Sequence, residues 1–538
     1  MRKGIWKLGA LCLAVLFLLT GCLPWGWEKF LENQPTRPPV VAFGDMEYTR
    51  QDVDALAASQ QEVLDSLADG DDAETLMEKV FAFYEEYNRY YTCYALANIY
   101  YSKDITDSYW EGEYSYCLET SARVDALLDQ MLYDLAASNL VKELESEDYF
   151  GQGFFDDYQG KSIWDETFTA LVEEEAMLQS KYYALSGQAS EEDPYSEAFL
   201  QNYGVKMADV FVELVRVRQE MAAYAGYSDY QSFAYDFYFG RDYTPGQAMG
   251  YLEDIREELV SLYQGVDYSP VWNLMNESCT ESQTYAYVRK CAKAMGGKIA
   301  EAFALMDAAE LYDISESTKK YDASFETYLT EYNEPYIFVN PQGNVYDKLT
   351  FTHEFGHFCN DYASFGTSVG VDVAEIFSQG MEYLSLCYVD DKQDLTMLKM
   401  IDCLNIYVEQ AAYASFEHQV YDLEGWELTR ENVYALYDSV GQAYGLDTWG
   451  WNSRTFVLIP HFFISPMYVV SYVVSNDAAL QLYQLEVESK GAGLKKLESN
   501  LDTMETQFLG FVDAAGLESP FKQGRIQKVR KTLEDVLG

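Results

Sequence analysis

The chain has 538 residues, 49% of them hydrophobic, and it carries 37 basic against 88 acidic side chains, a formal net charge of −51. A chain of this length can bury large cores and ordinarily divides into two or more domains or lobes. The hydrophobic fraction argues against extended disorder. The strongly negative charge repels phosphate backbones, so we expect no nucleic acid among the partners.

The N-terminus has the pattern of a bacterial lipoprotein signal peptide. A positively charged head precedes the apolar run 11–19, and Leu-Thr-Gly-Cys at 19–22 is a small-residue cleavage site that ends in cysteine. The run is short for a helix that spans a bilayer. We therefore predict that residues 1–21 are removed, that Cys22 carries lipid, and that 22–42 form a tether. The remainder would be extracytoplasmic, anchored to the outer face of the bacterial cytoplasmic membrane.

Most of the chain has apolar residues at helical spacing. One such stripe runs from Met207 to Met221, and Thr244 followed by Pro245 gives an N-cap and a first-turn proline for another helix. The sequence does not show the alternation of strands and helices that would indicate a parallel sheet. We predict a mostly α fold, with an N-terminal helical lobe at 43–240 and a second helical lobe at 241–538.

One strand interrupts the helical pattern. Residues 335–339 are apolar and aromatic, and the Asn-Pro-Gln-Gly-Asn sequence at 340–344 has the residues of a turn. Asp347 then stands where it can cap the next helix. Residues 336–339 of this strand are also a candidate to pair with an extended peptide backbone.

The predicted helix after the turn carries the motif HEFGH. His353 and His357 are four residues apart, so their rings lie on one helix face and can reach a common ion. Glu354 lies beside them, near enough to reach a water on that ion without being a ligand. The chain has only four histidines, so a chance occurrence of this pattern is rare. The motif predicts one zinc ion, Zn²⁺.

Two histidines leave a catalytic zinc one protein ligand short. A second helical stripe follows at 371–386 and offers three carboxylates, those of Asp372, Glu375 and Glu382. Spacing alone does not choose among them. Each of them, taken singly, is equally explained as a solvated side chain of an acidic protein.

Two segments resemble the zinc oligopeptidases of the thimet oligopeptidase and oligoendopeptidase F family. They are PYIFVNPQGNVYDKLTFTHEFGH at 335–357 and DVAEIFSQGMEY at 372–383. The resemblance is strong over 225–480. It implies that Glu375 is the third zinc ligand and that Glu382 orients a histidine ligand. The connection between the two segments is shorter than is usual in the family.

A further resemblance covers Ile-Pro-His-Phe-Phe at 459–463 and two tyrosines after it. In the family this histidine and a tyrosine stabilise the oxyanion of the substrate, which implies these roles for His461 and Tyr472. Tyr468 is one turn earlier, as a second donor. His418 has no ligand pattern around it and is expected to be a hydrogen-bonded core histidine. Asn360 replaces a histidine that is common in the family.

The resemblance also implies the architecture and the activity. We expect two helical lobes around a deep substrate channel, with a small β-sheet next to the HExxH helix, and a zinc metalloendopeptidase that hydrolyses short unstructured peptides. Three alternatives stay open. They are a zinc carboxypeptidase or dipeptidyl-type peptidase on a related helical fold, a peptide-binding lipoprotein that serves a transporter, and a catalytically idle descendant of the family.

Overall fold

The structure is a computed structural model, and the residues it describes are 39–146, 149–160, 162–190, 193–366, 369–389, 393–503 and 505–537. The predicted signal peptide, Cys22 and most of the predicted tether lie outside the described residues. Within these ranges, no helix combines the length and the apolar character needed to cross a membrane.

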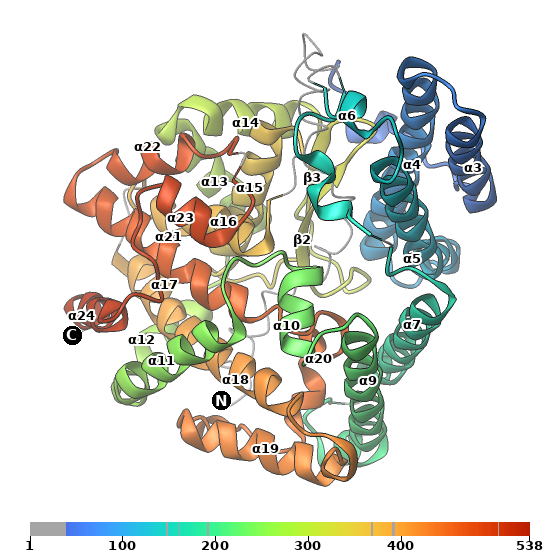
Figure 1. Cartoon of the computed structure of the whole chain (residues 1–538). Coiled ribbons are helices and arrows are strands. Elements are labelled where there is room, and N and C mark those ends of the chain that lie inside the picture. The colour runs from blue at the N-terminus through green and yellow to red at the C-terminus, as the bar shows by residue number, and fades with distance from the viewer. Residues whose placement is uncertain are drawn as a thin grey trace.

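Helices make up most of the described chain (Figure 1). In the first half they are α3 (Val53–Asp69), α4 (Ala73–Lys103), α5 (Ser108–Ala136), α6 (Val141–Leu144), α7 (Glu166–Ser186), α8 (Glu197–Phe199), α9 (Val205–Tyr224), α10 (Tyr230–Phe233), α11 (Pro245–Gly265), α12 (Ser269–Met275), α13 (Glu281–Met295) and α14 (Gly297–Ala308).

The second half is also helical after a short three-stranded segment. Its strands are β1 (Tyr312–Asp313), β2 (Ser324–Leu329) and β3 (Glu334–Val339). Its helices are α15 (Asp347–Ser364), α16 (Val371–Ser385), α17 (Gln393–Asn405), α18 (Ala411–Val420), α19 (Arg430–Ala443), α20 (Pro460–Ile464), α21 (Val470–Glu488), α22 (Ala492–Glu498), α23 (Phe508–Ala514) and α24 (Arg525–Leu537). The predicted mostly α fold is confirmed.

Local sequence explains where several helices begin. Asp52, Asp72 and Asp165 cap α3, α4 and α7 by accepting backbone N–H groups of the first turn. Thr244 and Gln247 form a capping box on α11, with proline at its first position, as the sequence predicts. The apolar stripe of α9 is buried throughout.

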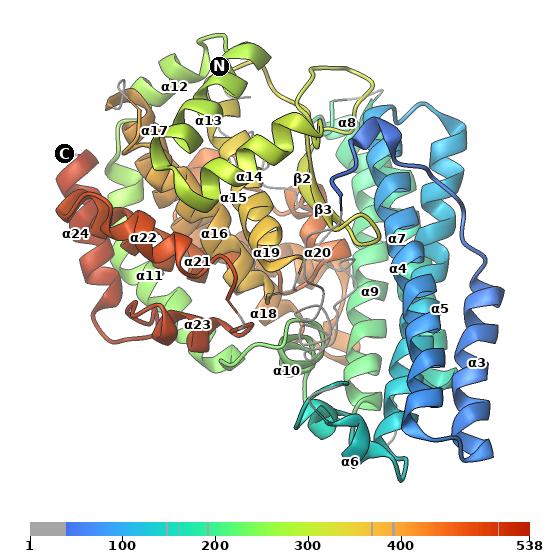
Figure 2. The ribbon, with the colours of Figure 1, turned by 90° about the horizontal axis from the view of Figure 1, so that it is seen from above.

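Helices α3, α4 and α5 pack around a core of their own. This core is rich in tyrosine: Tyr84, Tyr87, Tyr90, Tyr91 and Tyr94 are all buried along α4. Figure 2 shows these three helices together with α7 and α9 as a group of long helices at one side of the molecule.

A second, larger core joins α7 and α9 to the C-terminal half of the chain. Tyr182 of α7 stacks on Phe463 of α20 with ring centroids 3.9 Å apart, and Phe211 of α9 packs against Phe456 and Phe462. This core therefore contains residues from both sides of the lobe border that the sequence predicts between residues 240 and 241. That border remains a prediction.

The small sheet lies against α15, so the predicted sheet next to the motif helix is confirmed. Its strand order is β1-β3-β2, with β1 parallel and β2 antiparallel to β3. Because β3 is the central strand, with β2 along its whole length and β1 at Ile337 and Phe338, the prediction that 336–339 pair with a peptide is wrong. Strand β2 is an edge of this sheet.

Asp347 fixes the junction between the sheet and α15. It is the first residue of the helix, and its carboxylate accepts the backbone N–H of Gln342 at 2.8 Å and of Asn344 at 3.0 Å. The predicted cap is therefore wrong: Tyr346 is the N-cap residue, with no side-chain capping bond, and the Asp347 side chain holds the preceding turn instead of the first turn of the helix. These two bonds tie the turn to the start of the motif helix.

Candidate metal centre

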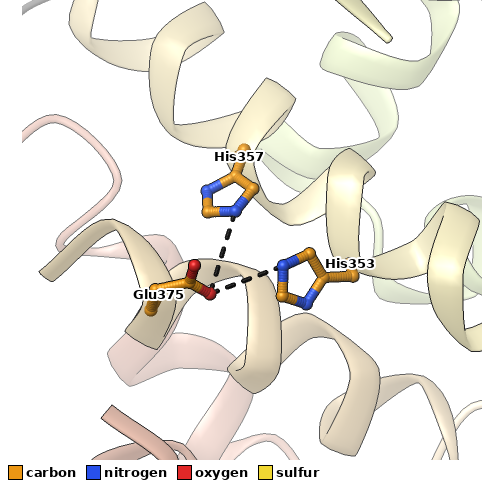
Figure 3. A group of neighbouring side chains, drawn as sticks. All are labelled: His353, His357 and Glu375. Atoms are coloured by element: carbon orange, nitrogen blue, oxygen red, sulfur yellow. Dashed lines mark ion pairs between the residues drawn. The ribbon is translucent and has the colours of Figure 1, made fainter. Parts of the chain in front are cut away.

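Helix α15 presents the HEFGH motif on a buried face. His353, Glu354 and His357 are each at most 6% exposed. The two imidazole rings are one helical turn apart, with centroids separated by 5.0 Å and planes inclined at 78°. Figure 3 shows both rings directed toward the neighbouring helix.

The neighbouring helix, α16, supplies Glu375, which is fully buried. Its Oε2 atom lies 3.4 Å from His353 Nε2 and 4.0 Å from His357 Nε2 (Figure 3). One donor atom from each of the three residues lies within 4.8 Å of the other two. Ligands about 2 Å from a tetrahedral zinc stand about 3.3 Å from one another. The donor set and its spacing therefore fit a zinc ion.

Gly356, inside the motif, lets the two helices approach this closely. A Cβ atom there would lie 2.6 Å from the carbonyl oxygen of Phe377 and 2.6 Å from Cα of Ser378, both in the backbone of α16. Any larger residue would push α16 away. The backbone contact at Gly356 thus determines how far Glu375 stands from the histidines.

Glu382, two turns beyond Glu375 on α16, orients His353. Its Oε1 atom is 2.8 Å from Nδ1 of His353, which leaves Nε2 directed at Glu375. Lys399 donates to Glu382 Oε2 at 2.8 Å and to Asp402 at 2.9 Å. Burial alone would raise the pKa of Glu382, but Lys399 and His353 lower it. A carboxylate behind the ring in this way fixes the tautomer of a ligating histidine.

Asp372, the third carboxylate considered from the sequence, points elsewhere. It receives hydrogen bonds from Arg241 Nε at 3.2 Å and from the Tyr243 hydroxyl at 2.9 Å. Of the three candidates, the geometry therefore selects Glu375 as the third ligand.

Glu354 lies beside the three candidate metal ligands and faces the sheet. Burial raises the pKa of its carboxyl group to about 7, while His353 and a hydrogen bond from Ser324 of β2 act in the opposite direction. Its Oε2 atom is buried and has no hydrogen-bond partner among the described residues. An acceptor is therefore available next to the three donors.

His461, Tyr468 and Tyr472 also gather here, on the side of α16 that faces α20 and α21. The Tyr468 hydroxyl donates to Glu375 Oε1 at 2.8 Å, and the Tyr472 hydroxyl lies 3.4 Å from His461 Nε2. Burial lowers the pKa of His461 to about 4, so its ring is neutral at neutral pH. The structure thus brings every residue of the predicted site together.

The remaining two residues singled out in the sequence lie in the core. His418 is 2.8 Å from the Tyr235 hydroxyl and 2.7 Å from the carbonyl oxygen of Ala414, a hydrogen-bonded core histidine as predicted. Asn360 donates to the carbonyl oxygen of Leu501 at 2.9 Å and ties α15 to the segment after α22.

Sequence analysis missed three residues that act on the ligands. Ser378 donates to Glu375 Oε2 at 2.9 Å, and its position three residues later on the same helix was a local signal. Lys399 of α17 donates to Glu382, and Asp402 of the same helix accepts a hydrogen bond from Lys399. They come from a different helix, so no local pattern signals them.

The N-terminal part of the chain matches a known domain family. Residues 43–161 match the model of the Peptidase M3 N-terminal domain. Oligopeptidase PepF of Bacillus subtilis (strain 168) is 30% identical over 167 residues, which cover 28% of this chain and 25% of that protein. The sequence match therefore spans about a quarter of the length of this relative.

Solved structures match far more of the chain. A protein assigned as an oligoendopeptidase F has a TM-score of 0.80 at 21% identity, covering 92% of this chain and 98% of its own. PZ peptidase A, in complex with an inhibitor, has a TM-score of 0.80 at 19% identity, covering 92% and 99%. A protein from Bacillus anthracis str. Ames, also assigned as an oligoendopeptidase F, has a TM-score of 0.77 at 19% identity, covering 92% and 98%. The chain thus has the fold of these proteins, and its residues 43–161 match the Peptidase M3 N-terminal domain.

Proposed function

We propose that the chain is a zinc-dependent metallo-oligopeptidase that hydrolyses peptide bonds in short unstructured peptides outside the cytoplasmic membrane. The observation that carries the proposal is the buried group of His353, His357 and Glu375 with Glu354 beside it. A zinc ion held by these three ligands would acidify a water molecule and polarise a peptide carbonyl.

Glu354 is the general base in this proposal. Its Oε2 atom accepts a proton from the attacking water and then delivers it to the nitrogen of the leaving amine. The absence of a partner for this atom among the described residues supports the assignment.

His461 and Tyr472 are the donors for the oxyanion. Each good donor of this kind contributes roughly 3 to 4 kcal/mol to the stabilisation of the transition state. Tyr468 already donates to the ligand Glu375, so its hydroxyl is better suited to orient that carboxylate. We therefore propose that the Tyr472 hydroxyl donates to the oxyanion. Tyr468 could serve as a second donor only after its hydrogen bond to Glu375 is broken.

The substrate proposal is a short extended peptide in a channel between the two helical parts of the chain. The edge strand β2 carries Ser324, which contacts Glu354. A peptide lying along this edge would bring its backbone next to the base and bind through main-chain hydrogen bonds, which tolerate varied sequences.

Mass spectrometry of products from a mixed peptide library, with and without a chelator, tests the activity. We expect internal cleavage of peptides with blocked termini, lost with the chelator and restored by zinc. Glu354→Gln should retain zinc and lower kcat about 10²–10⁴-fold. Release of free C-terminal residues alone would identify a carboxypeptidase, and binding without cleavage would identify a peptide-binding lipoprotein.

We further propose that the protein is a lipoprotein attached through Cys22. The support is the Leu-Thr-Gly-Cys sequence after a charged head and an apolar run. The wild-type protein should fractionate with membranes and carry lipid on Cys22 in mass spectra of its N-terminal peptide. Membrane association that persists in Cys22→Ala would contradict this attachment.

A further inference from the structure

A single buried arginine connects the two sides of the candidate site. Arg241 precedes α11, and its Nε atom donates to Asp372 on α16 at 3.2 Å. Its Nη2 atom donates to the carbonyl oxygen of Met467 at 2.9 Å and to the Ser471 hydroxyl at 2.8 Å. The Arg241 side chain is 1% exposed. One guanidinium therefore joins α16 to the segment between α20 and α21.

Each partner of Arg241 is next to a residue of the site. Asp372 is one helical turn before Glu375 on α16. Met467 immediately precedes Tyr468, and Ser471 immediately precedes Tyr472. The guanidinium thus links the helix of the carboxylate ligand to the backbone beside both tyrosines.

The segment that carries Tyr468 depends on contacts of this kind. Met467 has a φ of 68°, in the left-handed region that non-glycine residues rarely adopt. Its N–H donates to the buried carboxylate of Glu417 at 3.0 Å, and its carbonyl oxygen accepts a hydrogen bond from Arg241. Such a conformation persists only where the surroundings over-determine it. Arg241 and Glu417 therefore hold Met467 from both sides.

Packing also fixes the guanidinium itself. Its carbon lies 4.2 Å from the ring centroid of Phe239 and 4.4 Å from that of Tyr235. The Tyr243 hydroxyl donates to the same carboxylate oxygen of Asp372 as Arg241 does. A planar, stacked fork with several donors holds this geometry, and the ammonium group of lysine does not reproduce it.

We propose that Arg241 is a positioning residue that sets Tyr468 and Tyr472 against Glu375 and so controls turnover and zinc retention. The proposal rests on the proposed function for its effect on turnover. Its effect on zinc retention is independent of any substrate, because Asp372 and Glu375 lie on one helix.

The first experiment uses the full zinc-loaded protein with an internally quenched peptide. Arg241→Lys should lower kcat about 10–100-fold, the usual effect of removing a group that orients ligands. KM should change by less than about threefold, since no substrate contact is removed. An unchanged kcat in a folded Arg241→Lys protein would overturn the proposal.

A double-mutant cycle separates positioning from a general loss of structure. Combining Arg241→Lys with Tyr468→Phe should cost less than the product of the two single effects, because Arg241 acts partly through this tyrosine. Additive effects on kcat would mean that Arg241 does not act through Tyr468.

Zinc competition with a chelator gives a readout that needs no activity. Arg241→Lys should weaken zinc retention about tenfold. If the zinc-loaded wild type cleaves no peptide, the proposed function fails, but this competition still tests Arg241. Unchanged zinc retention together with normal turnover refutes both parts of the proposal.

Two variants control for folding. Arg525 forms another buried ion pair, with Asp477 of α21 at 2.8 Å, and the other hydrogen-bond partners of Asp477 are Tyr251, Tyr407 and Gln481, none of them a residue of the site. Arg525→Lys should lower thermal stability while kcat and zinc retention stay at wild-type values.

If Arg241→Lys does not fold, Ser471→Ala replaces it. This variant removes one contact of Arg241 and should lower kcat about threefold to tenfold. A folded Ser471→Ala protein with wild-type kcat would then contradict the proposal.

Discussion

The two sides of the candidate site are positioned in different ways. The ligands His353, His357 and Glu375 project from two regular helices, and the helices touch at Gly356. On the opposite side, His461 lies in the five-residue helix α20, Tyr468 in the irregular segment after it, and Tyr472 in the first turn of α21.

Contacts from distant parts of the chain hold that irregular side. Arg218 of α9 donates to the carbonyl oxygens of Phe462 and Phe463, just after His461. Arg241 and Glu417 hold Met467, just before Tyr468. Helix periodicity thus fixes the metal side, whereas long-range hydrogen bonds fix the tyrosine side. Changes on the metal side should act on zinc binding and changes on the tyrosine side on turnover, whereas a change of Arg241, which contacts both sides, should act on both.

The largest expected effect is on the metal side. Glu375→Ala removes the third ligand, so zinc retention and activity should both be lost. Metal content after gel filtration, measured by plasma mass spectrometry, checks this prediction. Zinc retained at one ion per chain would transfer the ligand role to Glu382.

On the tyrosine side, Tyr472→Phe should lower kcat about 10²–10³-fold and leave zinc content unchanged. Steady-state kinetics with one reporter peptide provides the measurement. Tyr383→Phe is the matched control, because this buried hydroxyl donates to Asn476 at 2.7 Å and touches none of the proposed ligands. A larger loss in Tyr468→Phe than in Tyr472→Phe would exchange the roles of these two tyrosines.

Glu382→Gln should have a smaller effect, about 10–100-fold in zinc affinity. Glutamine keeps one hydrogen bond to His353 but loses the charge that pairs with Lys399. Chelator competition followed by activity recovery measures it. If affinity is unaffected while kcat falls, Glu382 acts on the reaction and not on the metal, and the contrast between the two sides breaks down.

The smallest effect we predict concerns the helix contact itself. Gly356→Ala should destabilise the fold by about 1–3 kcal/mol, because its Cβ atom would overlap the backbone of α16. Urea unfolding of the zinc-loaded protein measures this. Gly250→Ala on α11 is the control: nothing lies within 4 Å of a Cβ there, and alanine favours the helix by up to about 1 kcal/mol.

Local periodicity accounts for what the sequence could predict. His353 and His357 follow from the four-residue spacing, and the α11 start follows from Thr244 and Pro245. The strand at 335–339 was predicted, but its central place in the sheet depends on β1 and β2, whose pairing is not a local property.

The rest of the site depends on tertiary contacts. Glu375 and Glu382 sit two turns apart on one helix, so periodicity could not separate ligand from orienting group. The close approach of α16 to Gly356 of α15 brings Glu375, and not Glu382, to the histidine nitrogens that face α16. Arg241 and Lys399 are buried charges in helical or loop segments with no motif around them, and only the fold shows what they hold.

The central claim is that one zinc ion is bound by His353, His357 and Glu375. The most direct measurement is anomalous X-ray diffraction at the zinc absorption edge from crystals of the zinc-loaded protein. The account predicts one strong peak, about 2.0–2.2 Å from Nε2 of both histidines and from a carboxylate oxygen of Glu375. A peak elsewhere, or zinc held by the two histidines with Glu375 turned away, would contradict it.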